Sequence, residues 1–105
     1  MIEQDYIPVE LVERLKKAGF ENEIKIHFGV IIIRPTIWQV LKWLREEKKM
    51  FVQISLFQYC YDYCILDTEM VYYDNEHKVL HQGPTGYSYN EAALAGIEYV
   101  LDNLI

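Results

Sequence analysis

The sequence predicts an α+β fold in which three helices pack on one face of a mainly antiparallel sheet of three to five strands. Three segments repeat apolar residues at the 3.6-residue spacing of an amphipathic helix, and the segments between them alternate apolar and polar residues as strands do. The chain has 105 residues, of which 51% are hydrophobic and 25% are charged. This length and composition are typical of one globular domain, which we place over residues 1–105.

The first helix is predicted over residues 8–19, where Pro8 stands at the start and apolar residues recur on one face. Gly19 suits the left-handed conformation that often follows a helix. Phe20 would then touch Leu15, which is the hydrophobic contact of a Schellman ending. We therefore expect this helix to stop at the glycine.

Two further helices carry the capping-box signal, in which a hydroxyl side chain and a Glu or Gln three residues later bond each other's backbone N–H groups. Thr36 and Gln39 mark the start of the second helix, and Ser88 and Glu91 mark the start of the third. The third helix also contains small residues that would let it approach the sheet closely, namely Ala92, Ala93, Ala95 and Gly96.

The segments between the helices predict strands. Residues 24–33 are rich in β-branched side chains and contain Gly29, so we expect one strand that bends at this glycine. Residues 51–58 alternate apolar and polar side chains, which indicates a strand with one face in water, and residues 61–66 form its hairpin partner. One or two shorter strands are predicted from residues 70–73 and 78–81, and a loop is predicted at residues 81–86.

The net charge of −6 is concentrated in the second half of the chain. Residues 51–105 contain one Lys against eight Asp and Glu, whereas residues 1–50 are nearly balanced. A nucleic-acid-binding protein normally presents a face of Lys and Arg to the phosphates. We therefore expect no nucleic-acid partner.

The hydropathy pattern predicts a cytoplasmic protein with no membrane partner. An apolar run at residues 30–33 ends at Arg34, and no run approaches the 18 residues that a membrane-spanning helix needs. Residues 1–6 carry Glu3 and Asp5 where a secretory signal would carry positive charge. In the reducing cytosol, the two cysteines are expected to be free thiols.

Four residues match the spacing of a two-Cys, two-His zinc finger, namely Cys60, Cys64, His77 and His81. A finger needs a helix that carries both histidines, but the segment between the Cys pair and the His pair is acidic and extended in character. The two cysteines would also lie roughly 13 Å apart on an extended strand. We therefore expect semi-buried thiols and solvated histidines, with no metal and no cofactor.

The same residue types could serve a thiol enzyme, with a cysteine as nucleophile and His77 or His81 as base. Asp62 lies between the two cysteines, and its negative charge would raise the pKa of a thiol rather than lower it. The five glycines are scattered, so the chain has no glycine-rich nucleotide loop. We therefore expect a protein that is not an enzyme.

Tyrosine is the enriched residue with functional promise, because seven of the nine tyrosines fall between positions 59 and 89. Tyrosine supplies rigid, amphipathic contact area and is common at protein interfaces. A tyrosine-rich sheet face would therefore suit a protein partner or a second copy of the chain. The other hypothesis is that each ring covers a small core with its hydroxyl in water. The candidate binding residues are Tyr59, Tyr61, Tyr63, Tyr72 and Tyr73.

Three stretches are together similar to a recurrent type of small uncharacterised protein of Bacteroides-type bacteria, their prophages and mobile elements. They are YIPVELVERLKKAGF at 6–20, RPTIWQVLKWLREEKKMFVQI at 34–54 and YSYNEAALAGIEYVLDNLI at 87–105. The similarity covers about half the chain, and its hallmarks are helix starts and core residues rather than catalytic groups. The resemblance implies a cytoplasmic, phage-related accessory protein and implies no reaction.

The sequence thus predicts a non-enzymatic accessory or adaptor domain that binds another protein or itself. The tyrosine-rich sheet face or the edge of an exposed strand would form the contact. The first alternative is a small metal-binding or thiol enzyme centred on the Cys and His residues. The second is an acidic decoy that occupies a nucleic-acid-binding protein, which the charge of the second half of the chain would favour.

Overall fold

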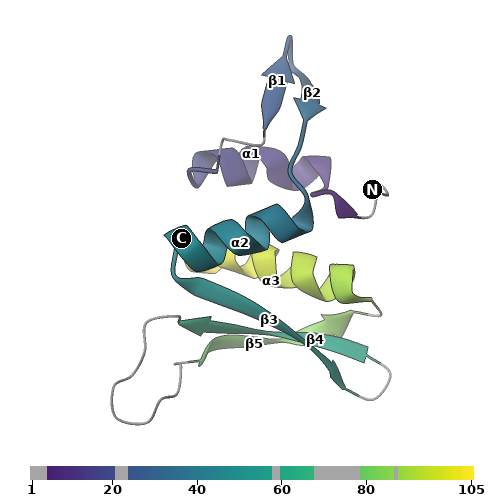
Figure 1. Cartoon of the computed structure of the whole chain (residues 1–105), viewed down its shortest axis with the longest axis vertical. Coiled ribbons are helices and arrows are strands. Elements are labelled where there is room, and N and C mark those ends of the chain that lie inside the picture. Colours follow the sequence, from purple (N-terminus) through teal and green to yellow (C-terminus); the bar gives the residue numbers. More distant parts are fainter. Residues whose placement is uncertain (1–4, 21–23, 58–59, 68–78, 87) are drawn as a thin grey trace.

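The computed structural model describes residues 5–20, 24–57, 60–67, 79–86 and 88–105. These residues form three helices, a three-stranded antiparallel sheet and a separate two-stranded hairpin. The molecule is elongated, with the large sheet at one end and the hairpin at the other, and the helices lie between them (Figure 1). The predicted α+β class, with helices packed on the sheet, is confirmed.

The large sheet has the strand order β3-β4-β5, and both neighbouring pairs are antiparallel. In the register between β3 and β4, Val52 pairs with Ile65 and Ile54 pairs with Tyr63. Paired residues share a face, so these side chains all point toward the helices. The bounds are Met50–Phe57 for β3, Cys60–Asp67 for β4 and Val79–Gly86 for β5.

The end of β5 corrects one prediction, because residues 81–86 belong to this strand and do not form a loop. The loop was predicted from the glycines and from Pro84, which are usual in turns. However, β5 is an edge strand of the sheet. A proline, which has no backbone N–H, is tolerated on an edge strand because one side of that strand needs no hydrogen bond to a neighbour. The predicted strand at residues 70–73 lies outside the described residues.

Helices α2 (Ile37–Glu47) and α3 (Tyr89–Asn103) cover one face of the sheet. Helix α3 crosses all three strands, whereas α2 contacts β3 and α3. The predicted close approach of α3 is confirmed, because Ala92, Ala93 and Gly96 are buried between the helix and its neighbours, while Ala95 is half-buried.

The starts of both helices agree with the predicted caps. The Thr36 hydroxyl accepts a hydrogen bond from the backbone N–H of Gln39 at 3.1 Å, and the Gln39 side chain accepts one from the N–H of Thr36 at 2.8 Å. At α3, the Ser88 hydroxyl accepts a bond from the N–H of Glu91 at 3.1 Å, which is the serine half of the predicted capping box. These bonds satisfy backbone donors that have no partner within the helix.

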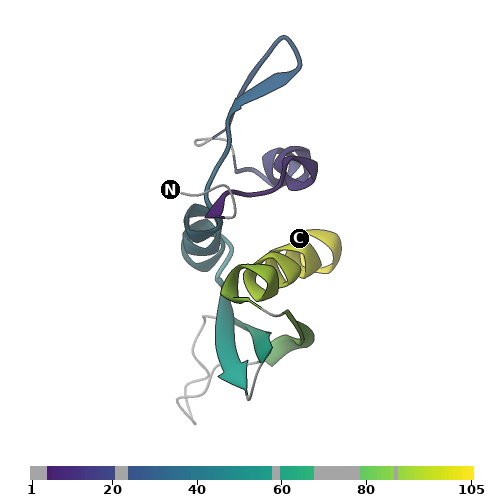
Figure 2. The same cartoon turned by 90° about the vertical axis from the view of Figure 1, so that its right-hand side faces the viewer.

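Helix α1 (Val9–Lys17) lies on the outer side of α3, away from the sheet (Figure 2). It ends in the predicted Schellman motif, with Gly19 at φ 106°. The N–H of Phe20 donates to the carbonyl of Leu15 at 3.0 Å, and the N–H of Gly19 donates to that of Lys16 at 3.1 Å. This ending turns the chain sharply toward the hairpin.

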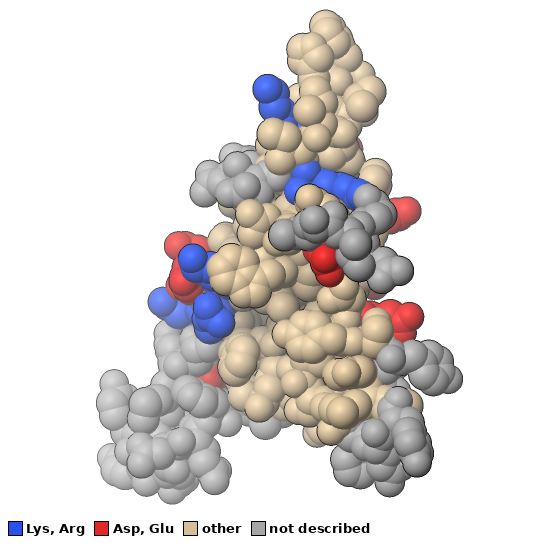
Figure 3. All heavy atoms as spheres, turned by 45° about the vertical axis from the view of Figure 1, so that its right-hand side comes forward, with Lys and Arg blue, Asp and Glu red and all other residues tan. Residues whose placement is uncertain are grey.

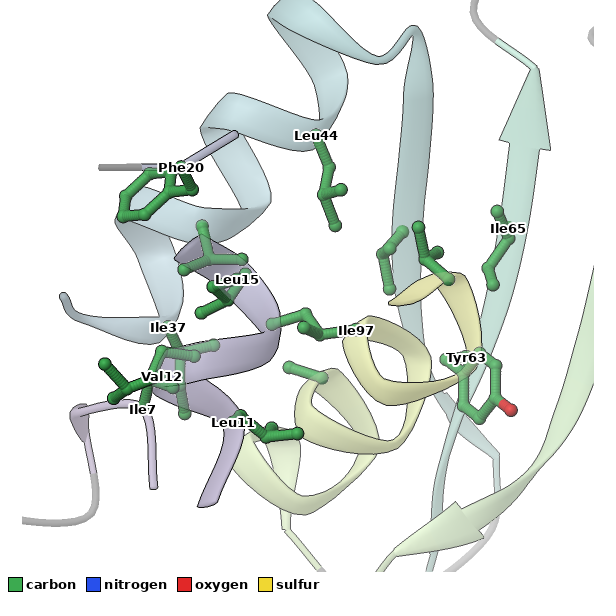
Figure 4. Packing of buried hydrophobic residues seen from close by; sticks show 14 residues of the cluster. Ile7, Leu11, Val12, Leu15, Phe20, Ile37, Leu44, Tyr63, Ile65 and Ile97 are labelled. Carbon is green, nitrogen blue, oxygen red and sulfur yellow. The ribbon is translucent and has the colours of Figure 1, made fainter. Parts of the chain in front are cut away.

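The hydrophobic core runs between α1, α2, α3 and the helix-facing side of the sheet. Figure 4 shows Leu11 and Leu15 of α1 pointing toward Ile97 of α3, while Tyr63 and Ile65 of the sheet lie on the other side of that helix. At the rim, Phe20 packs edge-on against Trp43 of α2, with 5.3 Å between the ring centroids. The part of the chain that the structure describes contains no helix long and apolar enough to cross a membrane.

The hairpin consists of β1 (Lys25–His27) and β2 (Val30–Ile33), which pair with each other and with no other strand of the described structure. The prediction of one bent strand over residues 24–33 is therefore wrong. Phe28 and Gly29 have φ angles of 51° and 77°, and two consecutive positive values define the tight turn that reverses a hairpin. The turn escaped prediction because Phe-Gly is not the usual Asn-Gly or Asp-Gly sequence.

Candidate functional site

The hairpin exposes the most prominent apolar surface of the described residues. Phe28 at its tip is 93% exposed, and Val30 and Ile32 on β2 are 63% and 55% exposed. Isolated apolar residues on a surface are ordinary, but several of them on one projecting element are typical of an interaction site. Ile26 and Ile33 complete the exposed group.

The base of the hairpin is held firmly against the body of the protein. Ile31 packs against the core, and Tyr6 forms an antiparallel bridge with Thr36. The N–H of Ile7 donates to the carbonyl of Pro35 at 2.9 Å, and an Nη1 of Arg34 donates to the carbonyl of Ile7 at 3.3 Å. The hairpin therefore projects from a fixed base, and binding through it would cost little ordering entropy.

The hairpin differs in charge from the rest of the chain. Residues 24–36 contain Lys25, His27 and Arg34 and no acidic residue, although the chain as a whole carries −6. In Figure 3, the projecting end is almost entirely uncharged, and Lys and Arg atoms appear near its base. A partner that complements this element would combine an apolar surface with negative charge.

A pocket of about 250 Å³ opens where the first turns of α2 and α3 meet the N-terminal segment. Two of its aromatic side chains are largely exposed, Trp38 by 66% and Tyr89 by 49%. The Asn90 side-chain amide donates to a carboxylate oxygen of Asp5 at 3.2 Å. The lining is mostly apolar and consists of Asp5, Thr36, Ile37, Trp38, Leu41, Tyr89 and Asn90.

The structure places only some of the candidate tyrosines. Tyr63 is 4% exposed and points into the core, so a partner could not reach its ring. Tyr61 is half-buried and contacts Tyr89, with 6.4 Å between ring centroids. Both point to the helix side of the sheet and not to its open face. Three other candidates, Tyr59, Tyr72 and Tyr73, lie outside the described residues.

The candidate Cys and His residues do not share a site in the described structure. Cys60 and Cys64 are free, half-buried thiols on the face of β4 opposite to the helices. His81 lies on the helix side, where its ring stacks on Tyr99 with 3.5 Å between centroids. No group of three metal-binding side chains occurs among the described residues, and His77 lies outside them.

The immediate surroundings of Cys64 also disfavour thiolate chemistry. Burial, and secondarily the negative charge of Asp62, raises the pKa of this thiol above its usual value. A reactive cysteine needs the opposite shift, since the thiolate is the nucleophile. The effect of Asp62 has the direction that the sequence predicts.

The hairpin and the pocket are features that sequence analysis missed. One signal was present, because Val30, Ile31, Ile32 and Ile33 form an unbroken apolar run. Such a run is typical of a strand that is covered on both faces. The described part of this chain leaves most of the run uncovered. The pocket had no comparable signal, since its walls come from three distant segments.

No protein-family model matches the chain, and no curated protein and no solved structure matches it either.

Proposed function

We propose that this protein is a non-enzymatic accessory domain that binds a protein partner, and that the β1–β2 hairpin is its docking element. The supporting observation is the exposure of Phe28, Val30 and Ile32 on a hairpin that projects from the body. Burial of one aliphatic or aromatic side chain contributes roughly 1.5–3 kcal/mol, so a few such residues can sustain a specific contact. The sequence suggested either the tyrosine-rich sheet face or an exposed strand as the contact, and this proposal adopts the exposed strand.

The architecture of the hairpin supports the same proposal. A two-stranded hairpin is only marginally stable in water by itself, and within the described residues both of its strands have an unpaired edge. A partner that covers the apolar side chains, or pairs with an edge, removes both liabilities. The Phe28 ring is well suited as an anchor, because aromatic side chains dominate the binding energy of many interfaces.

The proposal is tested with a photo-reactive benzoylphenylalanine placed at position 28 of the full chain in cells of the native host. The matched control carries the same group at position 9, because Val9 is also exposed, by 53%, but lies on α1. We expect covalent protein adducts from position 28 and few from position 9. Equal adduct yields from the two positions, or none from position 28, would contradict a hairpin docking site.

A further inference from the structure

We propose that the partner is a second copy of this chain, and that two hairpins pair along β2 so that each tip enters the pocket of the other copy. This inference rests on the proposed function, since it names the occupant of the same docking element. Three properties of the described residues lead to it, namely the unpaired edge of β2, the position of the pocket and the distribution of charge.

The edge of β2 is suited to pair with its own copy. The strand contains four apolar residues and no charged one, whereas natural edge strands usually carry charges that prevent such pairing. Antiparallel pairing about a two-fold axis through Ile32 would place Ile32 of the two copies opposite each other and Ile31 of one copy opposite Ile33 of the other. Pairing along β1 is less favourable, because it would bring Lys25 of each copy next to His27 of the other.

This register brings the tip of each hairpin to the base of the other. Phe28 precedes β2 by two residues, so it would lie close to Pro35 and Thr36 of the second copy. Thr36 and the adjacent Ile37 line the pocket. The strand pairing and the tip-to-pocket contact are therefore compatible within one symmetric dimer.

The size and lining of the pocket favour a side chain as its occupant. Sites for small molecules usually enclose about 300–1,000 Å³. The volume of about 250 Å³ lies below this range. A phenyl ring needs only apolar walls and stacks well on aromatic neighbours, and the walls here include the exposed rings of Trp38 and Tyr89.

Charge and contact area also agree with self-association. The hairpin is basic, whereas the chain outside it is acidic and contributes the Asp5 carboxylate to the pocket. A stable interface buries about 800 Å² of surface on each partner. One aromatic side chain can bury about 150–250 Å², and Phe28, Trp38 and Tyr89 would each contribute part of such an area. The exposed aliphatic residues of β2 add to this area.

The proposed arrangement limits the assembly to two chains. Each copy donates one hairpin and offers one pocket, and the two-fold axis uses both at once. In a head-to-tail arrangement, by contrast, the hairpin of one copy would enter the pocket of the next copy only. Such an assembly would have a free hairpin at one end and a free pocket at the other, and it would grow into a filament. The expected species is therefore a dimer and not a larger polymer.

The first test measures the mass of the purified full chain by sedimentation equilibrium over a wide range of concentrations. We expect a monomer–dimer equilibrium that Val30→Ser and Phe28→Ser each weaken by at least about tenfold. Val9→Ser is the matched control and should leave the equilibrium unchanged. Because Phe28 and Val30 are exposed in the monomer, thermal unfolding should confirm that all three variants remain folded.

The second test locates the contact. Purified chains with benzoylphenylalanine at position 28 are mixed with isotopically labelled wild-type chains and irradiated. Adducts between the two kinds of chain at residues 35–41 or 89–90 would support the arrangement. A strict monomer, or adducts that map elsewhere, would overturn it.

The two proposals can fail separately. If the purified chain is monomeric but position 28 still forms adducts with another protein in cells, the dimer is excluded and the docking role of the hairpin stands. If the monomer instead binds vesicles of anionic lipid through Phe28, the hairpin contacts a membrane surface and both proposals are overturned.

Discussion

The aromatic ring of Tyr63 on β4 lies directly over Gly83 on β5. A β-carbon at position 83 would be only 2.0 Å from Cζ of this ring. Gly96 of α3 borders the same ring from the helix side, where an added β-carbon would be 3.2 Å from Cδ2. The ring therefore fills a space that exists because two glycines, one in the sheet and one in a helix, have no side chain.

We expect Gly83→Ala to lower the free energy of unfolding by about 1–3 kcal/mol, which is typical of overpacking in a core. The ring cannot move aside easily, because Gly96 holds it on the other side. Urea unfolding followed by circular dichroism measures the effect. In a Tyr63→Leu background the same substitution should be much less harmful, and an equal loss in both backgrounds would show that the ring is not the cause.

Gly96→Ala tests the helix side of the same packing. An alanine inside a helix normally stabilises it by about 1 kcal/mol relative to glycine. Here the new β-carbon would be 2.6 Å from a methyl carbon, Cγ1, of the buried Val52. Since overpacking costs about 1–3 kcal/mol, we expect a net loss of stability.

The control for this prediction is Gly96→Ala combined with Val52→Ala, which removes the obstructing methyl group. In that background the helix propensity of alanine should prevail, so Gly96→Ala should become neutral or stabilising. A substitution that stabilises the wild-type background as well would show that α3 does not approach β3 as closely as described.

Features that depend on neighbouring residues in the sequence were predictable. The capping box of Thr36 and Gln39 and the Schellman ending at Gly19 involve residues at most a few positions apart, and both are confirmed. The alternation of residues 61–66 also placed Tyr63 and Ile65 on one face of a strand. In these cases the chemistry of one short segment determines its structure.

Features that depend on distant segments were not predictable. Alternation cannot tell which face of β4 the helices cover, so Tyr63 could not be distinguished in advance from a surface tyrosine. Gly83 suggested a loop because its true role, to accommodate the ring of Tyr63, requires knowledge of the strand pairing. The pocket combines Asp5, Trp38 and Tyr89, which only the tertiary fold brings together.

Burial of Tyr63 makes stability sensitive to alkaline pH. Burial, and secondarily Tyr99, raises the pKa of its phenol above the usual value of 10.0. The neutral phenol therefore contributes stability that is complete below the unfolded-state pKa. This contribution is lost as the pH rises from the unfolded-state pKa through the folded-state pKa. In this range the Tyr63 phenol loses its proton more readily in the unfolded chain than in the folded one.

The variant Tyr63→Phe keeps the ring but removes the titrating hydroxyl. We expect its free energy of unfolding to fall less steeply than that of the wild type as the pH rises above 10.0. Urea unfolding at a series of alkaline pH values measures the two slopes. Identical slopes would contradict a raised pKa for Tyr63, since the other tyrosines and lysines are common to both proteins.

Cys64 is expected to react slowly with alkylating agents. Its thiol pKa is raised, first by burial and then by Asp62, so the fraction of reactive thiolate near neutral pH is smaller than in free cysteine. The rate with iodoacetamide is measured in a Cys60→Ser background, which leaves one thiol. Asp62→Asn should accelerate the reaction only in part, because burial is the larger cause of the shift, and unfolding in urea should remove the protection. A folded-state rate at or above that of free cysteine would contradict this account and would restore Cys64 as a candidate nucleophile.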